Sequence, residues 1–295
     1  MITDFIHWLA YFVASFLPFE CMDAQFMKLA LLGLLLIAPL AAVTGIQVVN
    51  SRMAFFSDAI GHSAFAGVAL GLIFSFSPNL SMPLLALFVG FLIMFLRRGS
   101  RLSSDTVIGV IFSAVVAFGL AVVSRNRGEG MEKMDIFLFG DILTIQESQI
   151  AILIVLALAF SVFQFFGYNR MLSISVNPQL ASVHQIPVAL YQYIFAGLLS
   201  LVVIYSVQAV GVILVTALLV VPAAAARNFS KNSSAMFWMS LLISIVSVIS
   251  GLLISAQKWA NTPAGATIVL CASFLFLISL IYARCQPGKT SDTEK

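Results

Sequence analysis

The sequence predicts an all-α membrane protein that crosses the bilayer with about eight or nine helices. The chain of 295 residues is 61% hydrophobic and only 9% charged, with a mean hydropathy of +1.07. Soluble domains carry about 25% charged residues and lack repeated apolar stretches of about 20 residues. In a membrane protein the position of charges matters more than their sum. The net charge of +3 therefore does not indicate a nucleic-acid partner, and we expect the partner surface to include membrane lipid.

The apolar stretches divide the chain into three parts. We expect an N-terminal segment at the membrane interface over residues 1–23, a transmembrane domain over 24–285 and a polar tail over 286–295. The candidate spans are 26–49, 54–77, 80–97, 105–124, 149–167, 189–207, 209–226, 235–256 and 263–283. The division between the sixth and seventh spans stays open, because 188–226 is nearly continuous and apolar and part of it could be a broken helix.

Lysine and arginine residues are unequally distributed between the two sides of these spans. Ten lie on the side that holds the C-terminal tail: Arg52, Arg97, Arg98, Arg101, Arg170, Arg227, Lys231, Arg284, Lys289 and Lys295. Five lie on the other side: Lys28, Arg125, Arg127, Lys133 and Lys258. The more basic side is the cytoplasmic one by the positive-inside rule. We therefore expect the N-terminal segment outside and the tail in the cytoplasm.

Two loops are long enough to have structure of their own. The external loop at 125–147 combines mixed charge with the apolar patch Ile136–Gly140, which fits a helix lying against the membrane. Its acidic residues could attract cations, although a solvated loop of mixed charge is the preferred interpretation. The cytoplasmic segment Asn177–Pro187 begins with a capping residue followed by proline, a pattern typical of a helix start. A short exposed helix there would suit docking of a soluble partner.

Small residues and prolines mark further points in the chain. Pro222 lies in the apolar run Gly211–Ala226, where a kink would free backbone carbonyls. The four alanines that follow would let another helix approach closely. Cys21, Cys271 and Cys285 lack CxxC spacing, so we expect unpaired small apolar side chains.

The second predicted span carries the chemistry. Asp58 and His62 lie four residues apart on one helical face, and a carboxylate inside a membrane helix costs about 2.5–3.5 kcal/mol on insertion scales. Such a residue indicates function by default. Carboxylate plus imidazole suits zinc, manganese or iron, although the pair could instead hydrogen-bond each other to hide a structural charge.

Two ligands are too few for a tight metal site, which takes four or more. Water, another helix or a second copy of the chain would complete the shell. Phe65 and Ala69 extend the ligand face, while Ser63, Gly67 and Gly71 form a ridge of small residues on which a neighbouring helix could pack.

Other chemistry finds little support. The chain has no GxxxxGK[ST], HExxH or GxSxG motif, which argues against a nucleotide-binding loop, a zinc protease of that type and a nucleophile elbow. Uphill transport would need an ATPase supplied by another chain, so we expect a transport subunit and not an enzyme. Two alternatives are a metal-dependent intramembrane enzyme, which would need a third ligand and a base inside the spans, and an ion-coupled secondary transporter.

From about residue 30 to 283 the sequence resembles the ABC-3 family, the membrane permeases of ATP-binding-cassette importers for zinc, manganese and iron. The most specific match is Met53–Gly67, which is similar to the family's Asp-x-x-x-His-x-x-x-x-Gly helix. The segments Asn177–Pro187, Gly211–Ala226 and Thr262–Leu270 resemble later family motifs. The family commonly has Ser before the histidine and Leu-Pro before the glycine, where this chain has Gly61 and Phe65-Ala66.

The resemblance implies a multi-pass permease of the bacterial inner membrane. Its metal ligands would be Asp58 and His62, with no permanently bound cofactor, and Gly61, Gly67, Gly71 and Pro222 would serve helix packing or gating. Its partners would be a cytoplasmic ATPase, an extracytoplasmic metal-binding protein and a second permease subunit, identical or paralogous. The ATPase would contact Leu180, Ala181, Ser182, Val183, His184 and Gln185. Neither the resemblance nor the ligand types separate zinc, manganese and iron.

Overall fold

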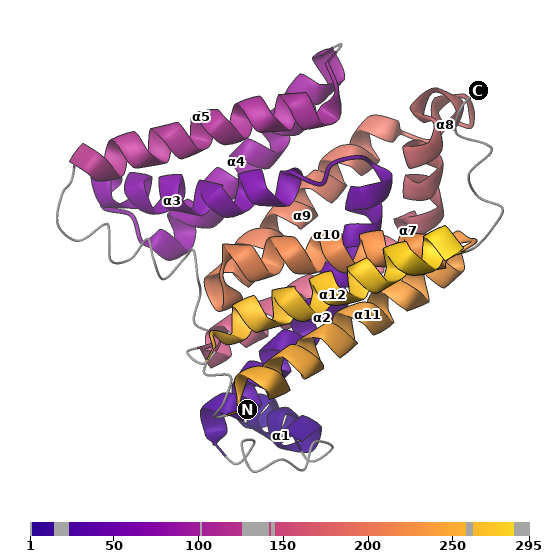
Figure 1. Cartoon of the computed structure of the whole chain (residues 1–295). Coiled ribbons are helices and arrows are strands. Elements are labelled where there is room, and N and C mark those ends of the chain that lie inside the picture. Colours follow the sequence, from indigo (N-terminus) through magenta and orange to yellow (C-terminus); the bar gives the residue numbers. More distant parts are fainter. Residues whose placement is uncertain are drawn as a thin grey trace.

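The fold was obtained as a computed structural model, which describes residues 2–14, 24–100, 102–125, 142, 145–257 and 262–285. Every regular element in these ranges is a helix (Figure 1). The long helices are α2 (Gln25–Asn50), α3 (Phe56–Phe74), α4 (Pro78–Gly99), α5 (Ser104–Arg125), α7 (Glu147–Val176), α9 (Val188–Val210), α10 (Val212–Phe229), α11 (Ser233–Ser255) and α12 (Ala264–Cys285).

Eight of these helices are long and apolar enough to cross a membrane, and α3 is a further helix of 19 residues between two of them. Each predicted span corresponds to one helix, with ends that differ by one to three residues except at α7. The predicted end at 167 was wrong, because α7 continues to Val176. The prediction of an all-α, polytopic membrane protein is confirmed.

The doubtful boundary near 208 separates two helices. The helix α9 ends at Val210, α10 begins at Val212, and Gly211 between them has φ 89° and ψ 160°. A positive φ of this kind suits glycine, because it has no Cβ. Pro222 does not divide α10, which continues through it to Phe229. Ala223, Ala225 and Ala226 are fully buried there, as expected of small residues at a close helix contact.

The N-terminal segment contains the helix α1 (Ile2–Ala14), which packs against α2 and α7. The ion pair between His7 Nε2 and Glu147 Oε1, at 2.7 Å, links it to the start of α7. Its position at the membrane interface stays a prediction. Cys21, the apolar patch Ile136–Gly140 of the external loop and the tail 286–295 lie outside the described residues.

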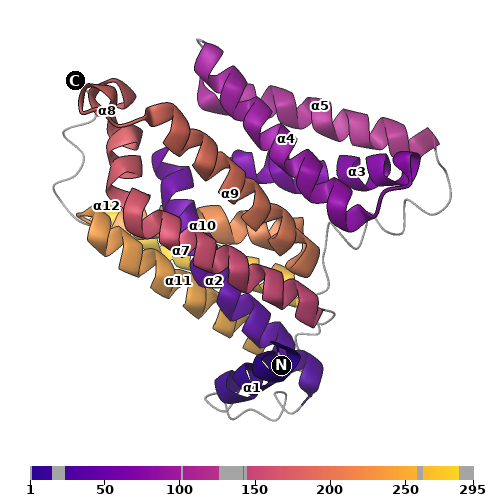
Figure 2. The ribbon, with the colours of Figure 1, turned by 180° about the vertical axis from the view of Figure 1, so that it is seen from behind.

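The helices form two groups that α9 connects (Figures 1 and 2). In one group α3 packs against both α4 and α5, while α2, α10, α11 and α12 pack against one another in the other. The helix α9 contacts α4 and α3 on one side and α7 and α10 on the other. The two ligand candidates on α3 therefore lie in the first group, close to its junction with the second.

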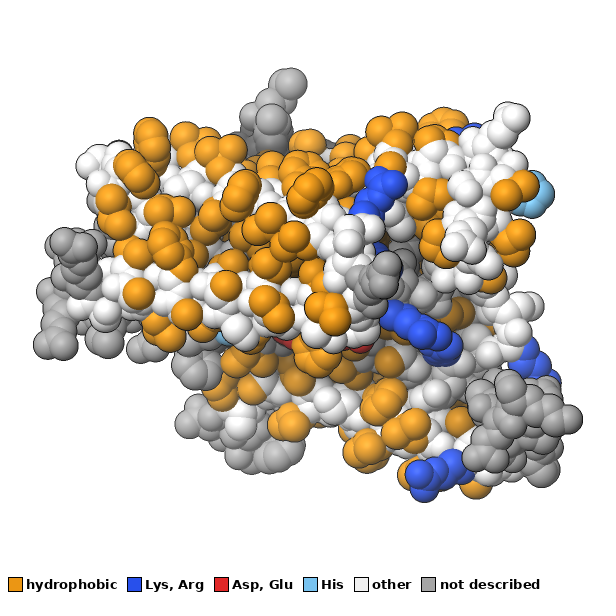
Figure 3. All heavy atoms as spheres, turned by 90° about the horizontal axis from the view of Figure 1, so that it is seen from above, with side chains coloured by type: hydrophobic (Ala, Val, Ile, Leu, Met, Phe, Trp, Pro, Cys, Tyr) orange, Lys and Arg blue, Asp and Glu red, His pale blue; other side chains and the backbone are white. Residues whose placement is uncertain are grey.

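The outer surface has the character expected in a bilayer. Figure 3 shows apolar side chains over most of one broad face, with lysine and arginine side chains toward one end. By the positive-inside rule we assign the end of the helices that holds Arg52 and Arg97, which line one cavity with Pro178 of α8 (Pro178–Val183), to the cytoplasm.

Candidate metal site

The helix α3 starts beside the middle of its neighbouring helices, with one side buried and the other open at the exposed Phe55. Phe56, its first residue, is fully buried. A Cβ added at Gly90, near the middle of α4, would lie 3.4 Å from the Phe56 ring and 2.1 Å from the hydroxyl of Ser200, near the middle of α9. Phe56 is therefore level with the middle of two spanning helices. Asp58 and His62 follow within the next two turns, so the polar pair lies close to the level of the middle of α4 and α9.

Asp58 belongs to the first turn of α3. The N-terminal end of a helix carries a partial positive charge, which favours a carboxylate at this place. Thr216 of α10 lies beside the Asp58 carboxyl group, and its hydroxyl donates a hydrogen bond to the Ile213 carbonyl oxygen at 3.4 Å. Asp58 therefore faces α10 and remains partly exposed, which leaves it accessible to an ion.

His62 lies between aromatic side chains of two helices. Its ring centroid is 5.5 Å from that of Phe65, one turn further along α3. It is 5.2 Å from that of Phe112 on α5, and these two rings meet edge to face. Among the described residues no hydrogen bond joins His62 to Asp58, but the two groups are close enough to interact electrostatically. Mutual shielding of the two side chains therefore stays an alternative to metal binding.

The glycines of α3 lie at its closest helix contacts. An added Cβ would lie 2.9 Å from Val212 Cγ1 at Gly61, 2.8 Å from Met82 Cα at Gly67 and 2.7 Å from Ser81 Oγ at Gly71. The first contact is with the start of α10 and the other two are with the start of α4. The predicted ridge of small residues thus faces α4, and the ligand pair lies near α5 and α10.

Within the described residues no group of three or more His, Cys, Asp and Glu side chains could hold a metal ion. The site that this part of the chain offers consists of Asp58 and His62, with Thr216 as a neighbouring oxygen. The sequence analysis did not identify Thr216, although its hydroxyl within the apolar run 209–226 was a usable signal. Nothing in the sequence marked Phe112, because its contact with His62 depends on how α5 packs.

The segment that leads into α3 is held by Arg97 at the end of α4. Arg97 donates hydrogen bonds from Nε to Ser104 Oγ at 2.8 Å, from Nη1 to Met53 Sδ at 2.9 Å and from Nη2 to the Ser51 carbonyl oxygen at 3.2 Å. Arg52, between the two residues it holds in this segment, has a positive φ of 52°. The backbone before α3 is thus fixed in a non-helical path.

The predicted surface helix is α8 (Pro178–Val183). The side chain of Asn177 caps it by accepting hydrogen bonds from the backbone N–H groups of Gln179 at 2.9 Å and Leu180 at 3.2 Å. Most of the predicted contact residues are exposed, whereas Ala181 is buried. This helix contacts α7 and α9.

A cavity of about 340 Å³ lies between α8 and the segment before α3. Its lining includes Pro178 of α8, Ser51 and Met53 of the segment, and Arg97. The surface helix and the polar pair are therefore separated by one cavity and one short, tightly held stretch of backbone.

Residues 23–283 match the family model described as the ABC 3 transport family. The chain belongs to this family. It is 32% identical over 256 residues to the high-affinity zinc uptake system membrane protein ZnuB of Haemophilus influenzae, covering 85% of this chain and 95% of that protein. It is 31% identical over 267 residues to the manganese import system permease protein ScaB of Streptococcus gordonii, and this match covers 88% of this chain and 92% of that protein.

A solved structure, PsaBC from Streptococcus pneumoniae in complex with Fab, contains a chain with the same fold. The TM-score is 0.73 at 28% identity, and the match covers 92% of this chain and 95% of that one. The ABC-3 relatives and the eight apolar spans agree in making this chain a multi-pass membrane transport protein.

Proposed function

We propose that this ABC-3 chain is the permease subunit of an ATP-binding-cassette importer that moves a divalent transition metal, zinc or manganese, into the cytoplasm. The observation that carries the proposal is the pair Asp58 and His62, which lies at the start of α3, close to the level of the middle of α4 and α9. The zinc and manganese permeases to which the chain is similar support the same conclusion.

In this proposal Asp58 and His62 bind the ion transiently during its passage. A carboxylate oxygen and a neutral imidazole nitrogen are ligands that zinc and manganese accept. A translocation site must bind well enough to accept an ion and weakly enough to release it. An incomplete ligand set in one chain meets both needs, because water and the second permease subunit can supply and withdraw the remaining ligands.

Thr216 and Phe112 have supporting roles in this scheme. In this scheme the Thr216 hydroxyl, which lies beside Asp58, turns from the Ile213 carbonyl oxygen to the Asp58 carboxylate and so joins α10 to the ligand pair. The edge of Phe112 limits the ring positions open to His62 and covers it on the α5 side. Movement of either α5 or α10 relative to α3 would change the ligand geometry, and this is how we propose that conformational change alters metal affinity.

The energy source in this proposal is a cytoplasmic ATPase that docks on α8, at Leu180–Gln185. The exposed face of α8 and its capped N-terminus support this assignment. Pro178 of α8 lines the same cavity as Ser51 and Met53. In this proposal a movement of α8 therefore shifts the nearby backbone segment before α3. An external binding protein would deliver the metal to the other side.

The decisive experiment is uptake of radioactive zinc and manganese into vesicles that contain the reconstituted importer. We expect Asp58→Asn and His62→Gln each to reduce uptake by at least about a hundred-fold, because each removes one of two ligands. Glu147→Gln is the control, since Glu147 lies at the start of α7 and pairs with His7 of α1, away from the ligand pair. ATPase binding should survive in all three variants.

The same assay separates the alternatives. Uptake that persists without ATP and collapses with the membrane potential would indicate a secondary transporter. Wild-type uptake by both ligand variants would refute the proposed site, and hydrolysis of a substrate by the isolated chain with metal would indicate an intramembrane enzyme.

A further inference from the structure

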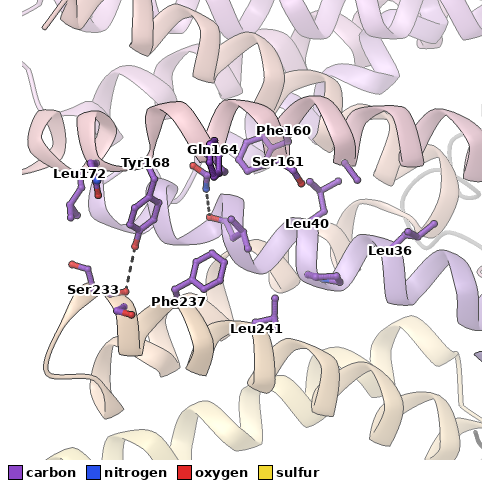
Figure 4. A pocket seen from close by; sticks show the side chains of 16 residues that line it. Leu36, Leu40, Phe160, Ser161, Gln164, Tyr168, Leu172, Ser233, Phe237 and Leu241 are labelled. Carbon is purple, nitrogen blue, oxygen red and sulfur yellow. Dashed lines mark hydrogen bonds between the residues drawn. The ribbon is translucent and has the colours of Figure 1, made fainter.

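A second cavity, far from the ligand pair, lies on the outer side of α2. Its volume is about 740 Å³, within the range of about 300–1,000 Å³ that is usual for small-molecule sites. The helices α7 and α11 form its walls and α2 forms its floor (Figure 4). All three are spanning helices, so the groove opens toward the hydrocarbon of the bilayer.

The groove is apolar along most of its length. Leu36, Pro39 and Leu40 of α2 form the floor, with Phe160 of α7 and Leu241 of α11 beside them. Phe165 of α7, which also lines the groove, is 85% exposed. These are the surfaces that an acyl chain of a lipid would cover without loss of any hydrogen bond.

Polar groups gather at one end of the groove. The hydroxyl of Tyr168 donates a hydrogen bond to the Ser233 carbonyl oxygen at 3.4 Å, across the groove from α7 to α11 (Figure 4). Asn169 and Ser234 line the same end. Deeper in the floor, Gln164 Nε2 donates to the Val43 carbonyl oxygen at 3.5 Å. The groove therefore has an apolar body and one polar end, like the two parts of a phospholipid.

Positive charge lies beside this polar end. Lys231 is exposed and stands two residues before Ser233, in the turn before α11. The first turn of α11, which begins at Ser233, adds the partial positive charge of a helix N-terminus. The basic side of the molecule faces the cytoplasm by the positive-inside rule, and that leaflet carries the anionic lipids. Arg170 does not contribute, because its guanidinium hydrogen bonds to Tyr191 of α9.

We propose that this groove binds an anionic phospholipid of the cytoplasmic leaflet, with one acyl chain between α7 and α11 and the phosphate near Lys231. Basic pockets between transmembrane helices on the cytoplasmic side bind such headgroups. The site is independent of the proposed metal path, since α2, α7 and α11 contribute neither Asp58 nor His62.

The test uses the purified full chain in detergent, loaded from vesicles of equal phosphatidylglycerol and phosphatidylcholine. Retained lipid is counted by mass spectrometry. We expect the wild-type chain to retain phosphatidylglycerol in preference to phosphatidylcholine. Lys231→Gln should reduce that preference about five-fold, the effect of one basic residue near an anionic headgroup, while Lys28→Gln on the other side of the membrane leaves it unchanged.

A matched pair on α7 tests the acyl-chain position. Ala157 lines the groove, whereas Ala159 is exposed on another face of the same helix. Ala157→Trp should lower retained phosphatidylglycerol about ten-fold or more, because the indole displaces two or more methylenes. Ala159→Trp should have no such effect.

Equal lipid retention by the two tryptophan variants, or no preference for phosphatidylglycerol in the wild type, would overturn the proposal. Loss of dimerisation in Ala157→Trp alone, measured by light scattering, would overturn it too, since a second copy of the chain would then be the occupant.

Discussion

Gly67 of α3 and Met82 of α4 lie so close together that a Cβ at Gly67 would stand 2.8 Å from the Met82 Cα. No side chain can move out of the way at such a contact, because the obstacle is backbone. The start of α4 is thereby fixed against the middle of α3, one turn beyond His62. The position of the ligand pair relative to α4 thus depends on the absence of one methyl group.

Gly67→Ala should therefore separate α3 from α4. We expect a loss of about 1–3 kcal/mol in the free energy of unfolding, as is usual for overpacking, and a matching fall in the melting temperature in detergent. Gly109→Ala on α5 is the control, because an added Cβ there meets nothing within 4 Å. That variant should be neutral or gain up to about 1 kcal/mol from higher helix propensity. Equal stability of the two variants would contradict the close contact.

The cap of α8 gives a test of the proposed ATPase contact. Asn177→Ala removes both side-chain hydrogen bonds at the start of α8, which should cost about 1 kcal/mol and loosen a helix of only six residues. We expect weaker binding of the ATPase, measured by co-purification at increasing salt.

Asn232→Ala is the control for that experiment, because Asn232 caps α11 by accepting a hydrogen bond from Ala235 N–H at 3.0 Å. It should lose similar stability and keep normal ATPase binding. The proposed docking site would be wrong if both cap variants weakened ATPase binding equally.

Arg97 should link the cytoplasmic side to the ligand pair. Arg97→Lys keeps the positive charge that helps to set membrane orientation, but an ammonium group cannot reach Ser104, Met53 and Ser51 together. We expect a stability loss of about 1.5–3 kcal/mol and a fall in maximal uptake rate with little change in the metal concentration for half-maximal uptake. Arg98→Lys, at the exposed neighbour, should leave both quantities unchanged. A changed half-saturation with a normal maximal rate would place Arg97 in binding instead.

Thr216 should tune metal affinity through Asp58. Thr216→Val keeps the shape of the side chain and removes the hydroxyl, whereas Thr216→Ser keeps the hydroxyl. We expect the valine variant to raise the half-saturating metal concentration about three- to ten-fold, the effect of one hydrogen bond of about 1 kcal/mol. The serine variant should restore most of the loss. Identical behaviour of the two variants would exclude a role for the hydroxyl.

The helices themselves were predictable because the bilayer imposes a length and a polarity on every spanning segment. Asp58 and His62 were predictable for the same reason, since ionisable groups are rare in such segments. The cap at Asn177 follows from local chemistry and was equally visible. Each of these features is determined by the residue itself and its neighbours along the sequence.

Features that depend on packing between distant segments could not be read in this way. Thr216 meets Asp58, and Phe112 meets His62, only after α10 and α5 have packed beside α3. The depth at which α3 begins depends on the contacts of Phe56 with α4 and α9. The break at Gly211 was undecided because an uninterrupted apolar sequence fits either one broken helix or two.

The buried start of α3 also sets the length of the path on one side of the ligand pair. After His62 the helix continues over Ser63–Phe74, about 18 Å at about 1.5 Å per residue. In the proposed function an ion that enters from outside therefore travels about this distance along α3 before it reaches His62, and a shorter distance remains on the cytoplasmic side.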